Sequence, residues 1–412
     1  MIEQTSYLDK LSKWQNQDVI KVITGIRRCG KSTLLNQFRE KLIRSGIHQD
    51  RIIFLNFEDL ANEELIDYRK LYSFISKKLD PDQMTYIFLD EVQMVPDFQK
   101  AVDSLFIKKN VDLYITGSNA YLLSGELATL LSGRYVEINM LPMSFSDFFQ
   151  IHSKPKDEAF SDYLRWGGFP YLVTCKEPEI IGNEYLEGIY NTIILKDIEQ
   201  RQMRRNPDPN KRKITDIALL KNISRFLANS IGNPLSDRKI ADYITSTGRK
   251  TSQNTISDYV DALVEPFIFY SAARYNVIGK ELLKQNRKLY IADIGLRNHI
   301  LQRSRYDLGF AIENIVFFEL LRRGYKVNVG KVGSMEIDFV AEKNSFLNYY
   351  QVTASMIDKS TFEREMASLA AVKDNYPKTI LTLDRFTLGD YNGIKVIHLL
   401  DWLLELRTGA FS

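Results

Sequence analysis

Eight consecutive residues near the start of the chain constrain its fold more than any other segment. Gly25-Ile26-Arg27-Arg28-Cys29-Gly30-Lys31-Ser32 fits the pattern G-x-x-x-x-G-K-S/T without a mismatch. The segment follows an apolar, β-branched run, Val19 to Thr24, and opens a helical pattern, which is the context that such a loop requires. Glycines allow a sharp turn whose N–H groups point at phosphate oxygens, and a helix N-terminus adds its positive end. The segment therefore predicts a nucleotide-binding loop between a strand and a helix.

The residue types within this loop predict separate roles. Lys31 is placed to neutralise the β- and γ-phosphates, and the Ser32 hydroxyl suits a Mg²⁺ ion. Cys29 is either a filler position or a redox switch, and we favour the filler because no second cysteine lies nearby to resolve an oxidised thiol. The predicted nucleotide-binding residues are Gly25, Arg28, Cys29, Gly30, Lys31, Ser32 and Thr33.

A second segment supplies acids. Four apolar residues, Tyr86 to Leu89, precede Asp90 and Glu91 and describe a buried strand that ends in two carboxylates. Ligands of open α/β sheets bind at this edge. We expect Asp90 to hold Mg²⁺ through water and Glu91 to orient or polarise the attacking water. Together with the phosphate loop, the acids predict nucleotide hydrolysis rather than binding alone.

Two further polar positions have open interpretations. A third strand, Val111 to Thr116, has the polar tip Gly117-Ser118-Asn119, and Ser118 or Asn119 would contact the attacking water if this strand neighbours the other two. The other interpretation is a turn that merely leaves the strand. Arg134 precedes a strand, and it is either a finger that reaches the nucleotide of a neighbouring subunit or a surface arginine.

Strand and helix patterns alternate through this first section. Apolar strand runs at 19–24, 52–57, 86–89, 111–116 and 136–140 are separated by helical patterns such as Ser32 to Ser45 and Phe98 to Lys109. This alternation predicts an α/β fold with a parallel sheet that is covered on both faces.

Charge is distributed unevenly over the 412 residues. The whole chain has a net charge of +3, which argues against a nucleic-acid partner if taken as an average. Between Lys196 and Arg305, however, 21 basic residues face 11 acidic ones, a net charge of +10, and the remainder is therefore at −7. A basic middle section between acidic flanks reopens the question of a nucleic-acid partner.

The basic section has the pattern of a winged helix. Helical spacing begins near Thr215, continues over Asp237 to Ser246 and Gln253 to Val264, and is followed by two strands, Phe267 to Ala273 and Lys288 to Ala292, around a basic loop. Helices followed by a hairpin are common among DNA-binding domains. We expect DNA contacts from Arg249, Lys250, Gln253 and Asn254 at the start of the last helix and from Lys284, Arg287 and Lys288 in the hairpin loop.

Acids on the same helix support a different use of this section. Asp258 and Asp261 lie on the outer face of the last helix, where they would repel phosphate. The alternative is a winged helix that binds a protein or packs subunits in a ring.

The C-terminal section is similar in element order to the core of PD-(D/E)xK nucleases. Glu313 on a helix and Asp338 on a strand match two of its acids. Gln351-Val352-Thr353 stands where Glu-x-Lys is needed, and a neutral amide is a poor Mg²⁺ ligand. We expect a nuclease-like fold without nuclease activity.

The whole pattern resembles the prokaryotic AAA+ type P-loop ATPases that carry a C-terminal domain of unknown function. That resemblance implies ATP as the nucleotide, a homo-oligomer, in one form a hexameric ring, and Arg134 near the nucleotide of a neighbour. The residues that carry it are Gly25 to Thr33, Asn56 to Asp59, Leu89 to Gln93, Thr116 to Asn119, Leu131 to Tyr135, Pro142 to Phe145, Gly167 to Pro170, Glu313-Asn314 and Glu336 to Phe339.

These observations predict four domains and a ranked set of functions. The domains are an AAA+ type P-loop ATPase core at 1–150, a helical lid or linker at 151–215, a winged-helix-like basic domain at 216–305 and a nuclease-like domain at 306–412. The first hypothesis is a Mg²⁺-dependent ATPase that binds or remodels DNA, including branched DNA. The second is a nucleotide-dependent switch that acts on a protein partner, and the third, which Gln351 and Thr353 disfavour, is an ATPase-coupled metal nuclease.

The sequence also predicts a compartment. No run of about 18 apolar residues is present, so we expect no membrane span, and the polar start is unlike a signal peptide. Two cysteines, Cys29 and Cys175, are too few for a disulfide framework. We therefore expect a cytoplasmic protein.

Overall fold

The computed structural model describes residues 5–405 apart from 118–130, 132, 200–201, 203–207, 209–212 and 303–306, and apart from the side chains of 284–286. Its chain forms two compact units. One comprises Met1–Leu141 with Glu265–Phe267, and the other comprises Pro142–Val264 with Ile268–Ser412. The first unit ends at Leu141, and the predicted ATPase core ends at residue 150. The other three predicted domains lie in the second unit apart from Glu265–Phe267, and their boundaries stay predictions.

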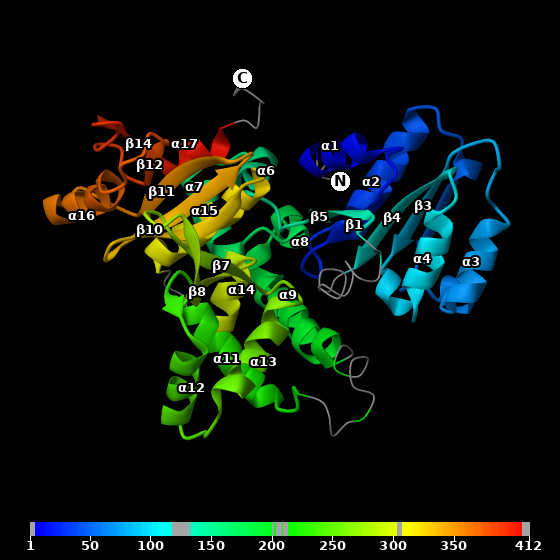
Figure 1. Ribbon diagram of the computed structural model, residues 1–412, viewed down its shortest axis with the longest axis horizontal. Helices are drawn as coiled ribbons and strands as arrows, with labels where there is room; N and C mark the ends of the chain where they lie inside the picture. The colour runs from blue at the N-terminus through cyan, green and yellow to red at the C-terminus, as the bar shows by residue number, and fades with distance from the viewer. Residues whose placement is uncertain are drawn as a thin grey trace. The chain divides into compact units, whose positions relative to one another are not determined.

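Five parallel strands form the centre of the first unit: β1 Ile20–Thr24, β2 Ile52–Asn56, β3 Thr85–Asp90, β4 Val111–Gly117 and β5 Tyr135–Asn139. Their order in the sheet is β2-β3-β4-β1-β5 (Figure 1). All four pairings are parallel. The predicted α/β class is confirmed, and β4 does lie between the strand that leads into the phosphate loop and the strand that delivers the acids.

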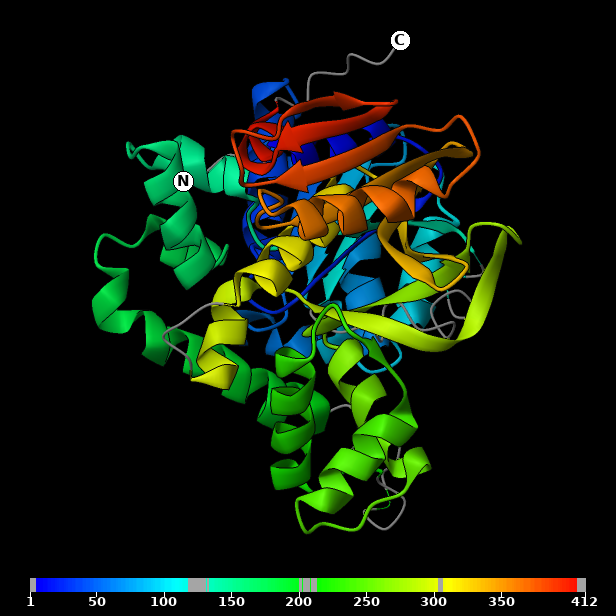
Figure 2. The same cartoon turned by 90° about the vertical axis from the view of Figure 1, so that its left-hand side faces the viewer.

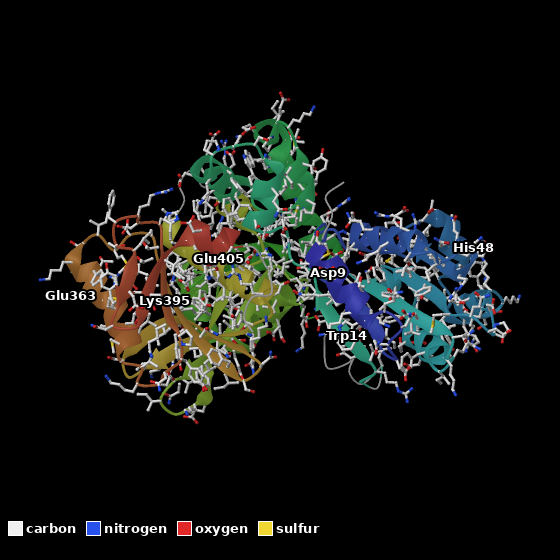
Figure 3. The ribbon with its side chains drawn as sticks, turned by 90° about the horizontal axis from the view of Figure 1, so that it is seen from above. Asp9, Trp14, His48, Glu363, Lys395 and Glu405 are labelled. Carbon is white, nitrogen blue, oxygen red and sulfur yellow. The ribbon has the colours of Figure 1, made fainter. Side chains whose placement is uncertain are left out.

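Alternating side chains bury both faces of this sheet. Ile87 and Leu89 of β3 pack in a cluster with residues of two helices, α3 and α4. Phe88, between them, points to the other face, where its ring stacks on Tyr114 at 4.8 Å and meets Phe38 of helix α2. Figure 3 labels Asp9 and Trp14 on helix α1. The helices are α1 Thr5–Trp14, α2 Lys31–Arg44, α3 Tyr68–Ser76 and α4 Phe98–Phe106, with 3₁₀ turns η1 Gln49–Arg51, η2 Leu60–Leu65 and η3 Val92–Met94.

The second unit begins with helices. A capping box between Ser144 and Asp147 starts the first of them. The buried carboxylate of Asp293 accepts hydrogen bonds from the backbone N–H groups of Gly168, at 2.6 Å, and Leu296, at 2.9 Å, and so ties the glycine turn after α7 to helix α14. The elements are α6 Phe145–Ile151, α7 Lys156–Trp166, α8 Pro170–Thr174, α9 Pro178–Asn191, the π-helical η5 Thr192–Asp197 and α14 Ile294–Leu301.

The middle of this unit has the element order of a winged helix. Helices α11 Ile217–Asn229, α12 Asp237–Ser246 and α13 Gln253–Val264 precede a hairpin of β7 Phe269–Asn276 and β8 Glu281–Ile291. The short strand β6 Pro234–Leu235 pairs with β8. Serine side chains cap the N-termini of α12 and α13: the hydroxyl of Ser236 accepts from the N–H of Lys239, and that of Ser252 from the N–H of Thr255.

The hairpin differs from its prediction. Strand β8 begins at Glu281, seven residues earlier than expected, and pairs with β7 over most of its length. The turn is confined to residues 277–280, so Lys284, Arg287 and Lys288 belong to a strand and not to a loop. The local charge density suggested a solvated loop, but pairing with β7 and β6 extends the strand through it.

One nine-stranded sheet joins the hairpin to the C-terminal section (Figure 2). Its order is β13-β14-β12-β11-β10-β9-β7-β8-β6, and β7 pairs in parallel with β9. Figure 3 labels two exposed side chains of the C-terminal section, Glu363 on a helix and Lys395 on a strand of this sheet. The remaining elements are α15 Leu308–Arg322, β9 Lys326–Val332, β10 Met335–Lys343, β11 Phe346–Thr353, α16 Lys359–Ala370, β12 Lys378–Thr382, β13 Gly389–Tyr391, β14 Ile394–His398 and α17 Leu399–Leu404.

Candidate functional site

The phosphate loop connects β1 to α2 as predicted, and its glycines are sterically required. Gly25 has a φ of 145°, and a Cβ on it would lie 2.1 Å from the carbonyl oxygen of Met140. Gly30, directly before the helix, has a φ of 108°. Arg28 also has a positive φ, of 67°. The angles at Gly25 and Gly30 are ones that residues with a Cβ rarely adopt, so the two glycines favour this loop conformation.

Lys31 extends its ammonium into this loop. The side chain is buried, and Nζ donates hydrogen bonds to the carbonyl oxygens of Gly25, at 3.1 Å, and Ile26, at 3.3 Å. The hydroxyl-bearing Ser32 and Thr33 follow in the first turn of α2 and are half-buried. A cation and the first N–H groups of a helix thus occupy the place that an anionic phosphate requires.

Cys29 is fully buried in the same loop. Burial raises the pKa of its thiol above the ordinary value, and the nearby Lys31 lowers it by less. Since the thiolate is the reactive form, this environment argues against the redox switch and in favour of a packing role. The Sγ atom lies 3.1 Å from where a Cβ on Gly25 would be, which shows how closely it packs under the loop.

Asp90 and Glu91 leave β3 beside this loop, and Thr116 of β4 contacts both. The hydroxyl of Thr116 donates a hydrogen bond to Oδ1 of Asp90 and accepts one, at 3.0 Å, from the backbone N–H of Glu91. The pairing of Leu89 with Ile115 sets this register. Burial raises the pKa of Asp90, and hydrogen bonds from Thr116 and Ser32 offset part of that increase.

Glu91 has a left-handed backbone conformation, with a φ of 53°. Its carboxylate Oε2 accepts a hydrogen bond from the side-chain amide of Gln93, and both residues are almost fully buried. A non-glycine residue at positive φ is uncommon and is found at functional sites. The role of Gln93 and the bridging role of Thr116 were not predicted, although both lie in the segments that carry the family resemblance.

The acids fit a Mg²⁺ ion. Oδ2 of Asp90 is buried and has no hydrogen-bond partner among the described residues, while the hydroxyl of Ser32 lies within hydrogen-bonding reach of the same carboxyl group. Buried carboxylate oxygens are normally satisfied by a hydrogen bond or by a cation. Hydroxyl and carboxylate oxygens are the ligands that Mg²⁺ prefers.

The two remaining predicted catalytic residues have different outcomes. Ser118 and Asn119 lie outside the described residues, so the sensor role stays a prediction. Arg134 is exposed, its guanidinium lies 5.8 Å from the centre of the Phe106 ring, and its carbonyl oxygen accepts from the N–H of Ile20 at the start of β1. The phosphate loop follows the other end of β1, so Arg134 lies at the sheet edge opposite its own nucleotide loop.

The predicted DNA-contacting residues divide into exposed and paired groups. Lys250, Gln253 and Asn254 are exposed around the start of α13. Arg249 forms an ion pair with Asp216. Gln253 also lines a groove of about 720 Å³ between α12, α13 and the hairpin.

The hairpin residues depart further from prediction. Arg287 lies within 3.7 Å of the carboxylates of Asp237 and Asp261. Lys288 is only 2% exposed and is paired with Glu313 and Glu336. A lysine enclosed in this way cannot also reach a nucleic-acid phosphate, so the prediction for Lys288 is wrong. The side chain of Lys284 is not among those that the structure describes.

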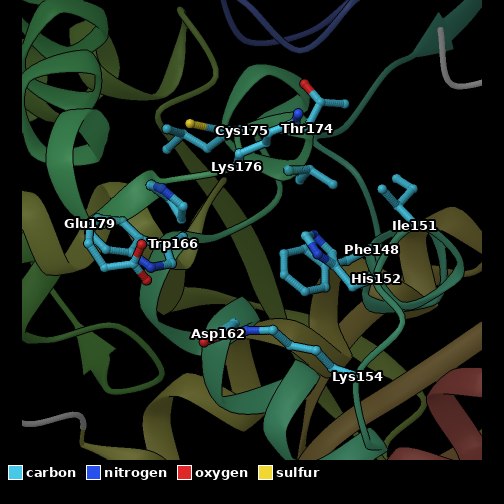
Figure 4. A pocket seen from close by; sticks show the side chains of 13 residues that line it. Phe148, Ile151, His152, Lys154, Asp162, Trp166, Thr174, Cys175, Lys176 and Glu179 are labelled. Carbon is cyan, nitrogen blue, oxygen red and sulfur yellow. The ribbon is translucent and has the colours of Figure 1, made fainter.

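The helices of the second unit enclose a cavity of about 520 Å³ (Figure 4). Its walls combine apolar side chains, including Phe148 and Trp166, with an ion pair between Lys154 and Asp162 at 2.6 Å. The indole N–H of Trp166 and Nε2 of His152 are buried, and neither has a hydrogen-bond partner among the residues that the structure describes. Of the predicted site residues that are described, none lines this cavity.

The sheet order, the loop and the acids define the first unit as an AAA-type P-loop domain. Residues 17–149 match the family described as AAA domain, and residues 157–307 match a domain of unknown function, DUF8612. An uncharacterized protein of Haemophilus influenzae is 41% identical over 411 residues, which cover 98% of this chain and 99% of the relative. An uncharacterized protein of Methanocaldococcus jannaschii is 30% identical over 342 residues, or 78% of this chain and 71% of the relative. The chain belongs to this family of AAA-domain proteins with a second domain of unknown function.

Two solved structures are similar to the chain at low identity. A Walker-type ATPase of Pyrococcus abyssi is 18% identical, with a TM-score of 0.48 over 73% of this chain and 96% of that one. The Orc1 protein of Aeropyrum pernix, solved in complex with DNA, is 13% identical, with a TM-score of 0.30 over 73% and 93% of the two chains.

Within the described part of the chain, no helix has the length and apolar character needed to span a membrane.

Proposed function

We propose that the chain is a Mg²⁺-dependent ATPase that works as a homo-oligomer and couples ATP hydrolysis to DNA binding or remodelling. The observation that carries this proposal is the meeting of Lys31, Asp90 and Glu91 at one edge of the sheet, with Thr116 contacting both acids. ATP is the expected nucleotide because the family resemblance implies it.

The residues of the loop would bind and stabilise the phosphates. Lys31 would exchange its hydrogen bonds to Gly25 and Ile26 for the β- and γ-phosphates, where its charge opposes the charge that develops in the transition state. A Mg²⁺ ion held by Ser32 and Asp90 would supply Lewis-acid stabilisation of the phosphate oxygens. Glu91 would orient the attacking water and accept its proton, with Gln93 fixing the carboxylate.

The position of Arg134 supports the proposal of a homo-oligomer. Because this exposed arginine lies at the sheet edge opposite its own phosphate loop, it can act on a nucleotide only in another subunit. An arginine supplied from a neighbour stabilises transition-state charge in many nucleotide hydrolases. We therefore propose Arg134 as a residue that acts in trans within a ring, of which the hexamer is one form.

The DNA part of the proposal depends on the exposed start of α13. Lys250, Gln253 and Asn254 present a cation and two amides at the end of a helix that enters the major groove in many winged-helix domains. The net charge of +10 between Lys196 and Arg305 would attract the phosphate backbone.

The pairing of Arg249 with Asp216 and the proximity of Arg287 to two aspartates favour a second candidate function. Cations already satisfied within the protein contribute less to phosphate binding. The same fold would then act as a nucleotide-dependent switch on a protein partner. The ATPase-coupled nuclease remains the least favoured.

One experiment tests both parts of the proposal. The ATPase rate is measured without DNA and with duplex, single-stranded and branched DNA over a range of salt concentrations. We expect DNA to stimulate the rate at low salt and the stimulation to fall as salt rises. The Lys31→Ala variant should lose turnover, whereas Lys41→Ala, an exposed lysine on the same helix, should keep it. Turnover by Lys31→Ala would refute the site, and a rate that is indifferent to DNA, without salt-dependent binding, would leave the protein-switch function.

A further inference from the structure

Five side chains from three elements of the second unit form a largely buried cluster of charged and polar groups. Lys288 of β8 donates a hydrogen bond from Nζ to Oε1 of Glu313 on α15, at 3.0 Å, and lies 2.7 Å from Oε1 of Glu336 on β10. The phenol of Tyr290, two residues along β8, donates to the same Oε1 of Glu313 at 2.8 Å. Asp338 follows Glu336 on β10 and is buried. Strand β8 thus brings its own cation to the acids of the nuclease-like section.

The cluster is closed from the winged-helix side. Glu313 is enclosed by Lys288, Tyr290 and the backbone at Gly232. A Cβ at Gly232, whose φ is 72°, would lie 2.9 Å from Oε2 of Glu313. Glu336 is the more open member, because about a third of its side chain is accessible to solvent.

The electrostatics keep the lysine charged. Burial alone would lower the pKa of Lys288, but the carboxylates of Glu313, Asp338 and Glu336 together raise it above its ordinary value. Burial raises the pKa of Asp338 well above the ordinary value, and the charge of Glu313 adds to that increase. One buried ammonium therefore offsets part of the negative charge of the three acids around it, and removing either member of such a buried ion pair is costly.

The remaining nuclease-like positions are committed to local hydrogen bonds. Oε1 of Gln351 accepts from the backbone N–H of Asp338 at 3.3 Å, and the carboxylate of Asp338 accepts from the N–H of Val352 at 2.8 Å. The hydroxyl of Thr353 donates to the carbonyl oxygen of Ser355 at 3.0 Å. Among the described residues, no group of three or more histidine, cysteine, aspartate or glutamate side chains is arranged to hold a metal ion.

We propose that the ammonium of Lys288 is the resident cation of this carboxylate cluster, in the place where a nuclease-like module would bind a divalent metal. The ion pairs of Lys288 fasten the β7–β8 hairpin to the C-terminal section, and the ammonium keeps a metal ion out of the carboxylate cluster. The cluster is thereby a metal-independent lock between two sections that the sequence presents as separate domains. The neutral amide of Gln351 agrees with this role, because a carboxylate at this position would add a further negative charge beside Asp338.

The lock is tested by exchanging its cation. We expect Lys288→Met to lower the thermal midpoint of unfolding by roughly 10 °C, because it leaves buried carboxylates without a partner. Excess Mn²⁺ should restore a large part of that loss by binding the vacated carboxylates, whereas the wild-type midpoint should not respond at this site. Binding of Mn²⁺ at the Asp90 site is common to all variants, so the comparison is the difference between variant and wild type. Lys326→Met, which removes an exposed lysine from β9 of the same sheet, is the matched control and should behave as wild type.

A second variant keeps the test decisive where Lys288→Met does not fold. The double variant Lys288→Met with Glu313→Gln removes one charge of each sign, so it should regain stability over the single variant and lose the response to Mn²⁺. A double variant no more stable than the single variant would overturn the proposal. Equal Mn²⁺ responses in wild type and Lys288→Met would overturn it as well. Mn²⁺-dependent plasmid cleavage by the wild-type protein that disappears in Lys288→Met would show instead that Lys288 belongs to an active nuclease site.

Discussion

Both units of this protein bury a lysine near carboxylates, but the two lysines have different partners. In the first unit, Lys31 donates to the carbonyl oxygens of Gly25 and Ile26, and the neighbouring Asp90 keeps one buried oxygen that has no hydrogen-bond partner in the described part of the chain. In the second unit, Lys288 binds the carboxylates of Glu313 and Glu336 directly. The first arrangement leaves polar groups available for a ligand, and the second satisfies them internally.

The difference separates two uses of the same residue types. Buried polar groups without partners are costly and persist where a ligand completes them. A buried ion pair with both partners present needs no ligand, and breaking it is costly. Proximity of a lysine to acids is therefore not enough to indicate a site that binds a ligand. The distinguishing feature is whether these groups already have hydrogen-bond or ion-pair partners within the protein.

The largest effect is expected from the carboxylate of the first unit. Glu91→Gln should reduce the ATPase rate by about 100-fold or more, because the amide cannot accept a proton from the attacking water. ATP binding, measured by equilibrium titration, should be retained, since Lys31 and the loop are unchanged. Glu336→Gln in the second unit should leave the rate unchanged. Comparable losses of turnover in both variants would erase the distinction between the two clusters.

The buried carboxylate of Asp293 is held by backbone N–H groups and not by a lysine. Burial raises its pKa to about 6, and hydrogen bonds from Gly168 and Leu296 offset part of the effect. Between pH 4 and 6 the folded protein keeps a proton that the unfolded chain has released, so the contribution of Asp293 to stability falls as pH rises through this window and is constant above it. The full shift corresponds to about 3 kcal/mol.

Removing the titrating group should remove this pH dependence. As pH is raised from 4 to 6.5, the thermal midpoint of the wild type should fall relative to that of Asp293→Asn. Asp242→Asn, at an exposed position of α12, is the control and should follow the wild type. A difference that moves in the opposite direction would mean that the backbone N–H groups stabilise the ionised carboxylate and lower its pKa.

A smaller effect is expected at Gln93. Because its amide donates to Oε2 of Glu91, Gln93→Leu should free that carboxylate and lower kcat by roughly 10-fold, the equivalent of one hydrogen bond to a charged group. KM should change little, since the hydrogen bond of the Gln93 amide is made to Glu91 and not to a phosphate-binding group. Gln49→Leu, an exposed position, is the control. A rise in KM with kcat unchanged would place Gln93 in nucleotide binding instead.

The sequence predicted the strongly patterned parts of the molecule. Helices α12 and α13 begin and end at the predicted residues, because Ser236 and Ser252 cap apolar stripes with helical spacing. The loop and the two acids of the nucleotide site were likewise identified, since their residue types and spacing are local.

Long-range pairing accounts for what was missed. Lys288 was assigned to a solvated loop, and its actual partners are 25 and more residues away in the sequence. Thr116 contacts Asp90 only through the register of β3 against β4, and Gln93 reaches Glu91 only because the backbone of Glu91 is left-handed. None of these three contacts has a signal in local hydrophobic or charge patterns.

The smallest effect is expected on the salt dependence of DNA binding, where the exposed Lys250 and the enclosed Lys288 should differ. Lys250 is exposed beside the start of α13, so Lys250→Gln should weaken DNA binding uniformly across sequences and reduce the slope of log affinity against log salt by about 1. Lys326→Gln, an exposed lysine outside the winged-helix section, should leave that slope unchanged. Lys288→Gln should lower stability without changing the slope, because an ammonium paired with Glu313 and Glu336 releases no counterion from DNA. If Lys288→Gln reduced the slope as Lys250→Gln does, Lys288 would have to leave its carboxylates on binding, and the cluster would be an opening contact rather than a permanent lock.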